Sequence, residues 1–166
     1  EQFPGSDLMI KEFPTGQASA NTIRNLLVQL SNYDDFVPDV LIIDYLELLR
    51  PIREVQQEYH AQQKVAEEVR GIAMEFNNLI WTATQTNRQG RMVKVITDAE
   101  LGDSYGKIRT CDFAMSLNQS EEEFDNGMMR GYVVKSRNGR PRFTVPMRVD
   151  YGTLRMSEGE EMFDDE

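Results

Sequence analysis

The chain contains very little cysteine and histidine. Its 166 residues include one cysteine, Cys111, and one histidine, His60. A single cysteine excludes an intramolecular disulfide and a cysteine metal cluster, which suits a reducing cytosol. A histidine with no cysteine or second histidine beside it favours a partly solvated polar residue over a metal ligand. No apolar run approaches the ~20 residues that span a bilayer, so we expect no membrane contact.

Basic residues are also scarce, since 18 lysines and arginines stand against 28 aspartates and glutamates, for a formal net charge of −10. Ten carboxylates lie in two clusters: Glu121, Glu122, Glu123 and Asp125, and then Glu158, Glu160, Glu161, Asp164, Asp165 and Glu166. The rest of the chain is therefore neutral, and a local basic loop could still contact phosphates. We expect one domain over residues 1–156 and an acidic, disordered tail over residues 157–166.

A phosphate-binding P-loop is absent. The segment Gly102-Asp103-Ser104-Tyr105-Gly106-Lys107-Ile108 has three residues between its glycines where the motif needs four, and Ile108 where a Ser or Thr should stand. Without that backbone cradle and its lysine, we expect the chain alone to bind ATP weakly and to be inactive as an ATPase. The chain starts at Glu1 without an initiating Met, so we expect a piece of a longer protein.

What the sequence does contain is a strongly apolar strand pattern that ends in a carboxylate, Val40-Leu41-Ile42-Ile43-Asp44. Four aliphatic residues in a row predict a central parallel strand buried on both faces. Asp44 would then stand at the carboxyl edge of the sheet, where α/β proteins bind ligands. A carboxylate there can hold Mg²⁺ through water, as the Walker B Asp does. The alternative is a strand that ends in a solvated or helix-capping Asp.

The flanking segments predict helices that cover this sheet. A strand-like segment, Leu8 to Phe13, comes first, and Ser19 then caps a helix. The apolar residues of that helix recur at i, i+3, i+4 and i+7: Ile23, Leu26, Leu27 and Leu30. A second helix, from about Glu54 to Phe76, carries one apolar stripe: Val65, Val69, Ile72, Ala73 and Phe76.

A second apolar strand, Leu79 to Thr84, follows the long helix and ends in Gln85. Strand, helix and strand at this spacing indicate a right-handed crossover between parallel strands, which brings both carboxyl ends to one edge. We therefore expect Asp44 and Gln85 to be neighbours. A glutamine at this position can orient a water molecule or sense a γ-phosphate. The alternative is an ordinary loop residue.

The loop after Gln85 is basic, with Arg88, Arg91 and Lys94 before the first carboxylate, and Asn87 lies among these charges. Such a loop suits the backbone of single-stranded nucleic acid. An ordinary solvated loop has a similar composition.

Three strands are expected near the C-terminus, at about residues 111–117, 128–135 and 143–149, and the last two pair across the turn at Asn138-Gly139. Around this hairpin lie Lys135, Arg137, Arg140 and Arg142, with no acid among them. Basic residues at a hairpin tip can reach the phosphates of another subunit, as arginine fingers do. A solvated hairpin tip is the alternative.

Six segments in this order and spacing resemble the replicative helicases of the DnaB type, especially those of T-even phages. They are Ile10 to Gly16, Asp39 to Leu49, Thr84 to Arg88, Thr97 to Ser104, Arg109 to Asp112 and Lys135 to Gly139. The resemblance implies an α/β, RecA-like domain with a mainly parallel sheet flanked by helices and an antiparallel C-terminal hairpin. Its P-loop half would be missing, so that residues 1–156 would be the C-terminal part of the motor.

The same resemblance implies roles for individual residues. Asp44 would be the Walker B carboxylate for Mg²⁺ and ATP, and Gln85 the switch between the γ-phosphate and DNA. Lys135 and Arg137 would enter the neighbouring subunit's ATP site as catalytic residues. DNA would be bound by Asn87, Arg88, Arg91, Lys94 and Gly102, the last within the family's central DNA loop.

The partners implied by the resemblance are single-stranded DNA, identical subunits in a ring that we expect to be a hexamer, and primase or other replisome proteins. The location implied is the cytoplasm, or the host cytoplasm for a phage protein. Two alternatives remain open. The chain could come from a RecA-type recombinase or clock-type ATPase, which lacks the Lys135-x-Arg137-x-Gly139 hairpin. It could also be a non-hydrolysing interaction module.

Overall fold

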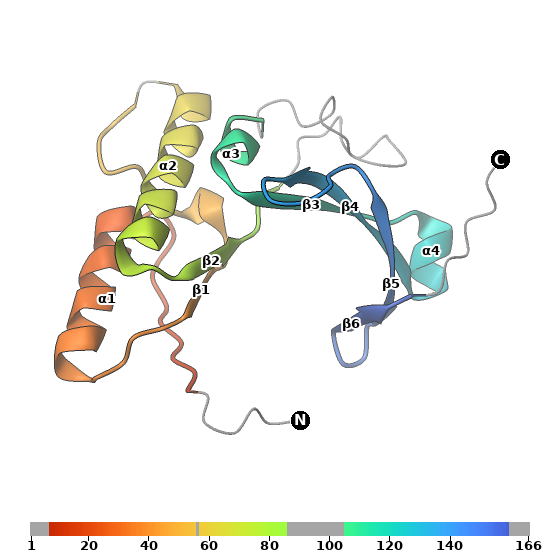
Figure 1. Ribbon diagram of the computed structural model, residues 1–166, viewed down its shortest axis with the longest axis horizontal. Coiled ribbons are helices and arrows are strands. Elements are labelled where there is room, and N and C mark those ends of the chain that lie inside the picture. Colours follow the sequence, from red (N-terminus) through yellow and green to blue (C-terminus); the bar gives the residue numbers. More distant parts are fainter. Residues whose placement is uncertain (1–6, 56, 86–104, 160–166) are drawn as a thin grey trace.

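The computed structural model describes residues 7–55, 57–85 and 105–159 (Figure 1). Helices α1 and α2 lie beside the short strands β1 and β2, and a larger sheet extends away from them. In chain order the elements are α1 (Ala20–Tyr33), β1 (Val40–Ile43), the 3-10 helix η1 (Leu46–Leu48), α2 (Glu58–Phe76), β2 (Leu79–Thr82), α3 (Tyr105–Thr110), β3 (Phe113–Asn118), α4 (Glu121–Asp125), β4 (Met128–Ser136), β5 (Thr144–Asp150) and β6 (Arg155–Glu158).

Helix α1 begins where the sequence predicts. The hydroxyl of Ser19 accepts a hydrogen bond from the Thr22 backbone N–H at 3.4 Å, and the Thr22 hydroxyl accepts one from the Ser19 N–H at 3.1 Å. This reciprocal pair satisfies two donors that a helix start otherwise leaves without partners. Ile23, Leu27 and Leu30 are buried, so the predicted apolar face is confirmed.

Helix α2 begins at Glu58, four residues later than predicted, and is capped at its C-terminal end by Asn77, which has a left-handed φ of 50°. Its stripe of Val65, Val69 and Ile72 is buried and packs on α1 and β1. Ten buried residues make this core: Ala18, Ala20, Ile23, Leu27, Ile43, Leu46, Leu49, Val65, Val69 and Ile72.

Strands β1 and β2 pair in parallel, with Val40 opposite Leu79 and Ile43 opposite Thr82, as predicted. The prediction that β1 is buried on both faces is wrong for the described residues. Ile42 is 73% exposed, and Trp81 on β2 is 49% exposed. Side chains alternate between the faces of a strand, and both helices cover the face that carries Ile43. The opposite face stays open in the described part of the chain.

The segment from Leu8 to Phe13 is not a strand, so that prediction is also wrong. Leu8 and Ile10 are exposed, whereas Phe13 packs against the core. A strand needs a paired neighbour for its backbone groups, and this segment has none among the described residues.

The larger sheet is antiparallel, in the order β3-β4-β5-β6. The three predicted C-terminal strands are confirmed, and β6, which pairs Arg155 with Asp150, is an additional edge strand. The acidic turn contains the short helix α4, capped by a reciprocal Ser120 and Glu123 pair. Because β6 includes Ser157 and Glu158, and residues 160–166 lie outside the described residues, the boundary at 156 stays a prediction.

Two side-chain contacts join β2 and α2 to the start of the antiparallel sheet. The rings of Trp81 on β2 and Phe113 on β3 meet edge to face, with centroids 6.1 Å apart. Asp112, just before β3, accepts a hydrogen bond from Arg70 of α2 at 3.1 Å. In the described residues, no helix is both long and apolar enough to cross a bilayer.

Candidate functional site

The carboxyl ends of β1 and β2 lie at one edge, as the crossover predicts. The Leu46 N–H donates to the Ala83 carbonyl at 3.2 Å, and the Thr82 hydroxyl donates to the Ile43 carbonyl at 2.9 Å. Beyond the strands, the Gln85 side-chain amide donates to the Tyr45 hydroxyl at 3.3 Å. Gln85 therefore lies against the residue that follows Asp44, and the expected proximity of the two strand ends is confirmed.

Asp44 is exposed at this edge, and its peptide bond to Tyr45 is cis. An exposed carboxylate, with an amide side chain bonded to the next residue, offers oxygen ligands of the type that Mg²⁺ and its bound waters prefer. The residues present therefore fit the metal side of a nucleotide site. Among the residues that the structure describes, none forms a backbone cradle for phosphates at this edge.

Glu47, on η1, forms a half-buried polar cluster next to this edge. Its Oε1 accepts a hydrogen bond from Lys107 Nζ of α3 at 2.6 Å and another from the Thr84 hydroxyl. The side chain of Lys107 is 9% exposed and that of Glu47 is 22% exposed. Burial acts to raise the pKa of Glu47, but the hydrogen bonds from Lys107 and Thr84 with the Lys107 charge outweigh it and lower that pKa. Glu47 is therefore held as a carboxylate.

The predictions from sequence did not include Glu47, Thr84 or Lys107. Lys107 belongs to the segment that fails as a P-loop, and the structure gives this lysine a carboxylate partner instead of a phosphate. The only sequence signal for Glu47 was its position three residues after Asp44, within the segment Asp39 to Leu49.

Lys135, at the end of β4, turns toward α3. Its Nζ donates to the Ile108 carbonyl at 2.9 Å and to the Arg109 carbonyl at 2.7 Å. A lysine near the last carbonyls of a helix satisfies acceptors that would otherwise lack partners. In this structure Lys135 therefore ties β4 to α3.

Arg137, just past β4, is half-exposed and is oriented by Asp112. Its Nε lies 2.8 Å from Asp112 Oδ1, and its backbone N–H donates to the Asp112 carbonyl at 2.9 Å. The hydrogen bond from Arg70, followed by the charge of Arg137, holds the pKa of Asp112 below its usual range. Arg137 is thus a fixed, accessible guanidinium at the base of the hairpin.

The predicted DNA-binding residues lie outside the described residues: Asn87, Arg88, Arg91, Lys94 and Gly102. Their roles, and those assigned to Asp44, Gln85, Lys135 and Arg137, stay predictions.

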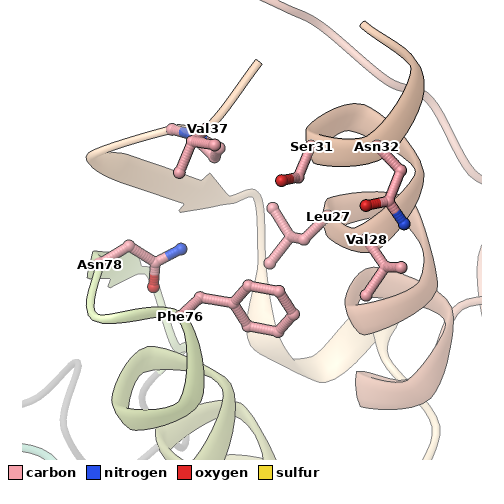
Figure 2. Close-up of a pocket in the computed structure, with 8 residues that line it drawn as sticks. Leu27, Val28, Ser31, Asn32, Val37, Phe76 and Asn78 are labelled. Atoms are coloured by element: carbon pink, nitrogen blue, oxygen red, sulfur yellow. The ribbon is translucent and has the colours of Figure 1, made fainter. Parts of the chain in front are cut away.

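A shallow pocket of about 140 Å³ lies at the opposite edge, where β1 and β2 begin (Figure 2). It is lined mainly by apolar side chains of α1, α2 and the segment before β1, among them Leu27, Val37 and Phe76. The amide of Asn78 lies at one side of it and the hydroxyl of Ser31 at another. This pocket is separated from Asp44 by the length of the strands, so it is not part of the carboxyl-edge site.

The chain is similar to known proteins in sequence and in fold. Over 118 residues, or 69% of its length, the chain is 34% identical to a DnaB-like replicative helicase of Enterobacteria phage T4. The chain spans about a quarter of that relative's length, since the match covers 25% of it. No family model matches the chain. The resemblance to DnaB-type replicative helicases is confirmed.

Two solved structures show the same fold. One, an ATPase domain, matches with a TM-score of 0.73 at 18% identity, over 86% of this chain and 52% of that one. A DnaB-like replicative helicase, solved in a study of its interactions with primase, matches with a TM-score of 0.68 at 19% identity, over 81% of this chain and 34% of that one. The predicted RecA-like α/β fold is therefore confirmed, with a larger antiparallel part than the single hairpin expected.

Proposed function

We propose that this chain, which resembles DnaB-like replicative helicases in sequence and fold, is part of an ATP-driven helicase that moves along single-stranded DNA and unwinds duplex. The 34% identity over 118 residues supports a helicase-related role and carries the proposal. Asp44 and Gln85 follow neighbouring parallel strands, and the hydrogen bond from Gln85 to Tyr45 supports a site at this edge. The chain matches a quarter of the T4 relative, so ATP hydrolysis, unwinding and assembly belong to the proposal.

In this proposal Asp44 would hold Mg²⁺ through water, and the metal would neutralise charge on the ATP phosphates. Gln85 would contact the γ-phosphate or orient the attacking water with its side-chain amide. The hydrogen bond from Gln85 to the Tyr45 hydroxyl keeps that amide beside the Asp44 edge. A P-loop carried by another part of the protein would supply the phosphate cradle.

Arg137 would act across the interface between subunits, on the ATP of a neighbour. It is half-exposed, and Asp112 fixes its direction without covering it. Lys135 donates instead to two carbonyls of α3, and both hydrogen bonds would have to break before its ammonium reached a phosphate. The geometry therefore favours Arg137 as the residue that acts in trans and Lys135 as its support. Subunits would form a ring, with primase as a candidate partner.

The test uses the longer protein that we propose contains this chain, with two inactive variants. Asp44→Ala should abolish hydrolysis by removing the metal ligand. Arg137→Ala should reduce hydrolysis about a thousandfold or more, as loss of other arginine fingers does, and leave assembly intact. Arg155→Ala, an exposed arginine on β6, is the matched control and should hydrolyse ATP normally.

Mixing the two inactive proteins decides whether the site is shared. Some mixed interfaces combine an intact Asp44 with an intact Arg137, so ATPase activity and unwinding of a forked DNA duplex should partly recover. Subunit exchange is followed by energy transfer between labelled proteins. Exchange without any recovery would overturn catalysis in trans. An unmutated protein that neither hydrolyses ATP nor unwinds DNA would overturn the proposed function.

A further inference from the structure

The ion pair between Glu47 and Lys107 joins segments that are 60 residues apart, at the edge where Asp44 and Gln85 lie. Glu47 follows β1 by four residues, and Lys107 lies on α3. Lys107 is nearly buried, and the two charged groups are 2.6 Å apart. The pair therefore fixes α3 against the chain that leaves β1.

Thr84 attaches a third segment to the same carboxylate oxygen. Its hydroxyl donates to Glu47 Oε1, which also accepts from Lys107. Thr84 immediately precedes Gln85, so Glu47 holds the backbone from which the Gln85 side chain extends. Two side-chain contacts, Glu47 with Thr84 and Tyr45 with Gln85, consequently add to the Leu46–Ala83 backbone hydrogen bond in holding the segments after β1 and β2 together.

A buried ion pair of this kind is an inefficient way to stabilise a fold. Desolvating a carboxylate and an ammonium can cost as much as their attraction returns, and an apolar pair is often as stable. Glu47 Oε2 is also buried without a hydrogen-bond partner in the described structure. A buried pair whose attraction is offset by desolvation, and which lies beside the predicted Asp44 and Gln85, indicates a requirement for position.

We propose that Glu47 and Lys107 are positioning residues, which hold the Thr84–Gln85 segment so that the Gln85 amide faces the Asp44 edge. The step from position to ATP hydrolysis rests on the function proposed above, whereas the positioning itself is a property of this chain. Neither residue needs to touch ATP.

Helix α3 is also attached to β4. Lys135 donates to the carbonyls of Ile108 and Arg109, so α3 is held to Glu47 through Lys107 and to β4 through its last carbonyls. Arg137 lies two residues beyond Lys135. The same short helix therefore sets the distance between the edge that carries Gln85 and the arginine that would serve a neighbouring subunit.

The first test needs only the 166-residue chain. The side-chain amide resonances of Gln85 are assigned by NMR and compared in Glu47→Ala, Lys107→Ala and Thr84→Val. We expect these signals to shift and broaden in all three variants, because each removes at least one contact of the cluster. Lys107→Arg should restore most of the native signal, since it retains a cation for Glu47. Glu75→Ala, which breaks the exposed Arg24–Glu75 pair of 2.7 Å, is the control and should leave Gln85 unchanged.

If Glu47→Ala does not fold, Glu47→Gln keeps the size of the side chain and removes its charge. Unchanged Gln85 signals in folded Glu47→Gln and Thr84→Val would overturn the positioning role.

The second test measures hydrolysis in the longer protein. Misplacing a reacting group by about 1 Å can cost on the order of 100-fold, so Glu47→Ala should lower kcat by about that factor with little change in the KM for ATP. A purely structural pair would lower Tm and leave kcat unchanged, and that result would overturn the inference. If the unmutated protein does not hydrolyse ATP, the proposed function fails, and the NMR result still decides whether Glu47 positions Gln85.

Discussion

The helical half of the molecule (residues 7–85) and the sheet half (residues 105–159) are stabilised in different ways. The helical half buries a core of ten residues between α1, α2 and β1. In the sheet half, the described residues include two buried aliphatic side chains, Val133 and Val134 on β4, and four strands are joined mainly by backbone hydrogen bonds. Apolar burial scales with the area removed from water, whereas a backbone hydrogen bond adds only about 0.5–1.5 kcal/mol net. Core substitutions should therefore matter more in the helical half.

The largest effect on stability is expected at Ile72, which is fully buried on α2. Ile72→Ala leaves a cavity among the core residues and should lower the free energy of unfolding by about 2–5 kcal/mol. Ile42→Ala is the matched control, because Ile42 is an isoleucine that lies on the open face of β1. It should change stability by less than about 0.5 kcal/mol. Urea unfolding followed by circular dichroism measures both, and equal losses would contradict the view that one face of β1 is open.

An intermediate effect is expected in the sheet half. Val134 is buried on β4 with Ile108, Ala114 and Tyr132 packed around it. Val134→Ala removes two methyl groups. It should lower the free energy of unfolding by about 1.5 kcal/mol, because each buried group contributes about 0.8 kcal/mol. Hydrogen exchange should show faster opening of β3 and β4 and unchanged protection in α2. Equal loosening of α2 would show that the two halves unfold as one unit.

The smallest effect is expected at Asp112, which joins the halves through Arg70 and Arg137. The pKa of Asp112 is lowered in the folded chain. The stabilisation that its carboxylate provides is therefore fully present above the usual Asp pKa of 3.8, and it is lost as the pH falls through the lower pKa of the folded state. Because the carboxylate is exposed, Asp112→Asn should cost less than about 1 kcal/mol at about pH 7. The difference from the unmutated chain should shrink as the pH falls below the usual Asp value of 3.8 and vanish once the folded carboxylate is protonated.

Urea midpoints measured at neutral and acid pH test whether the stability difference between Asp112→Asn and the unmutated chain shrinks as the pH falls. Glu75→Gln, which weakens an ion pair within the helical half, serves as the control. A penalty for Asp112→Asn that grows as the pH falls would contradict the assignment of Asp112 as a carboxylate paired with arginines.

Local features of the fold could be predicted from the sequence. Ser19, the apolar stripes of α1 and α2, and the strands that lead to Asp44 and Gln85 all follow from patterns within a few residues, although β2 ends at Thr82, two residues earlier than predicted. The neighbouring positions of Asp44 and Gln85 follow from the parallel crossover, because it places both carboxyl ends at one edge.

Features that depend on distant segments could not be predicted. Four aliphatic residues in β1 show that the strand is apolar, but they do not show which elements cover each face. Strand β6, Arg-Met-Ser-Glu, has no alternating pattern and forms because β5 offers an edge. The Glu47–Lys107 pair spans 60 residues, and no local motif marks either partner. The orientation of Lys135 toward α3 depends in the same way on where that helix lies.

Trp81 is the only tryptophan of the chain, and it lies on the open face of β2 against Phe113, where the two halves meet. Indole fluorescence depends on the polarity around the ring, so the emission maximum of the unlabelled protein reports on this one place. A segment that covers the face would move the emission to shorter wavelength, and separation of β2 from β3 would move it to longer wavelength. The fluorescence of Trp81 therefore reports whether the open face of the parallel strands is covered and whether β2 stays in contact with β3.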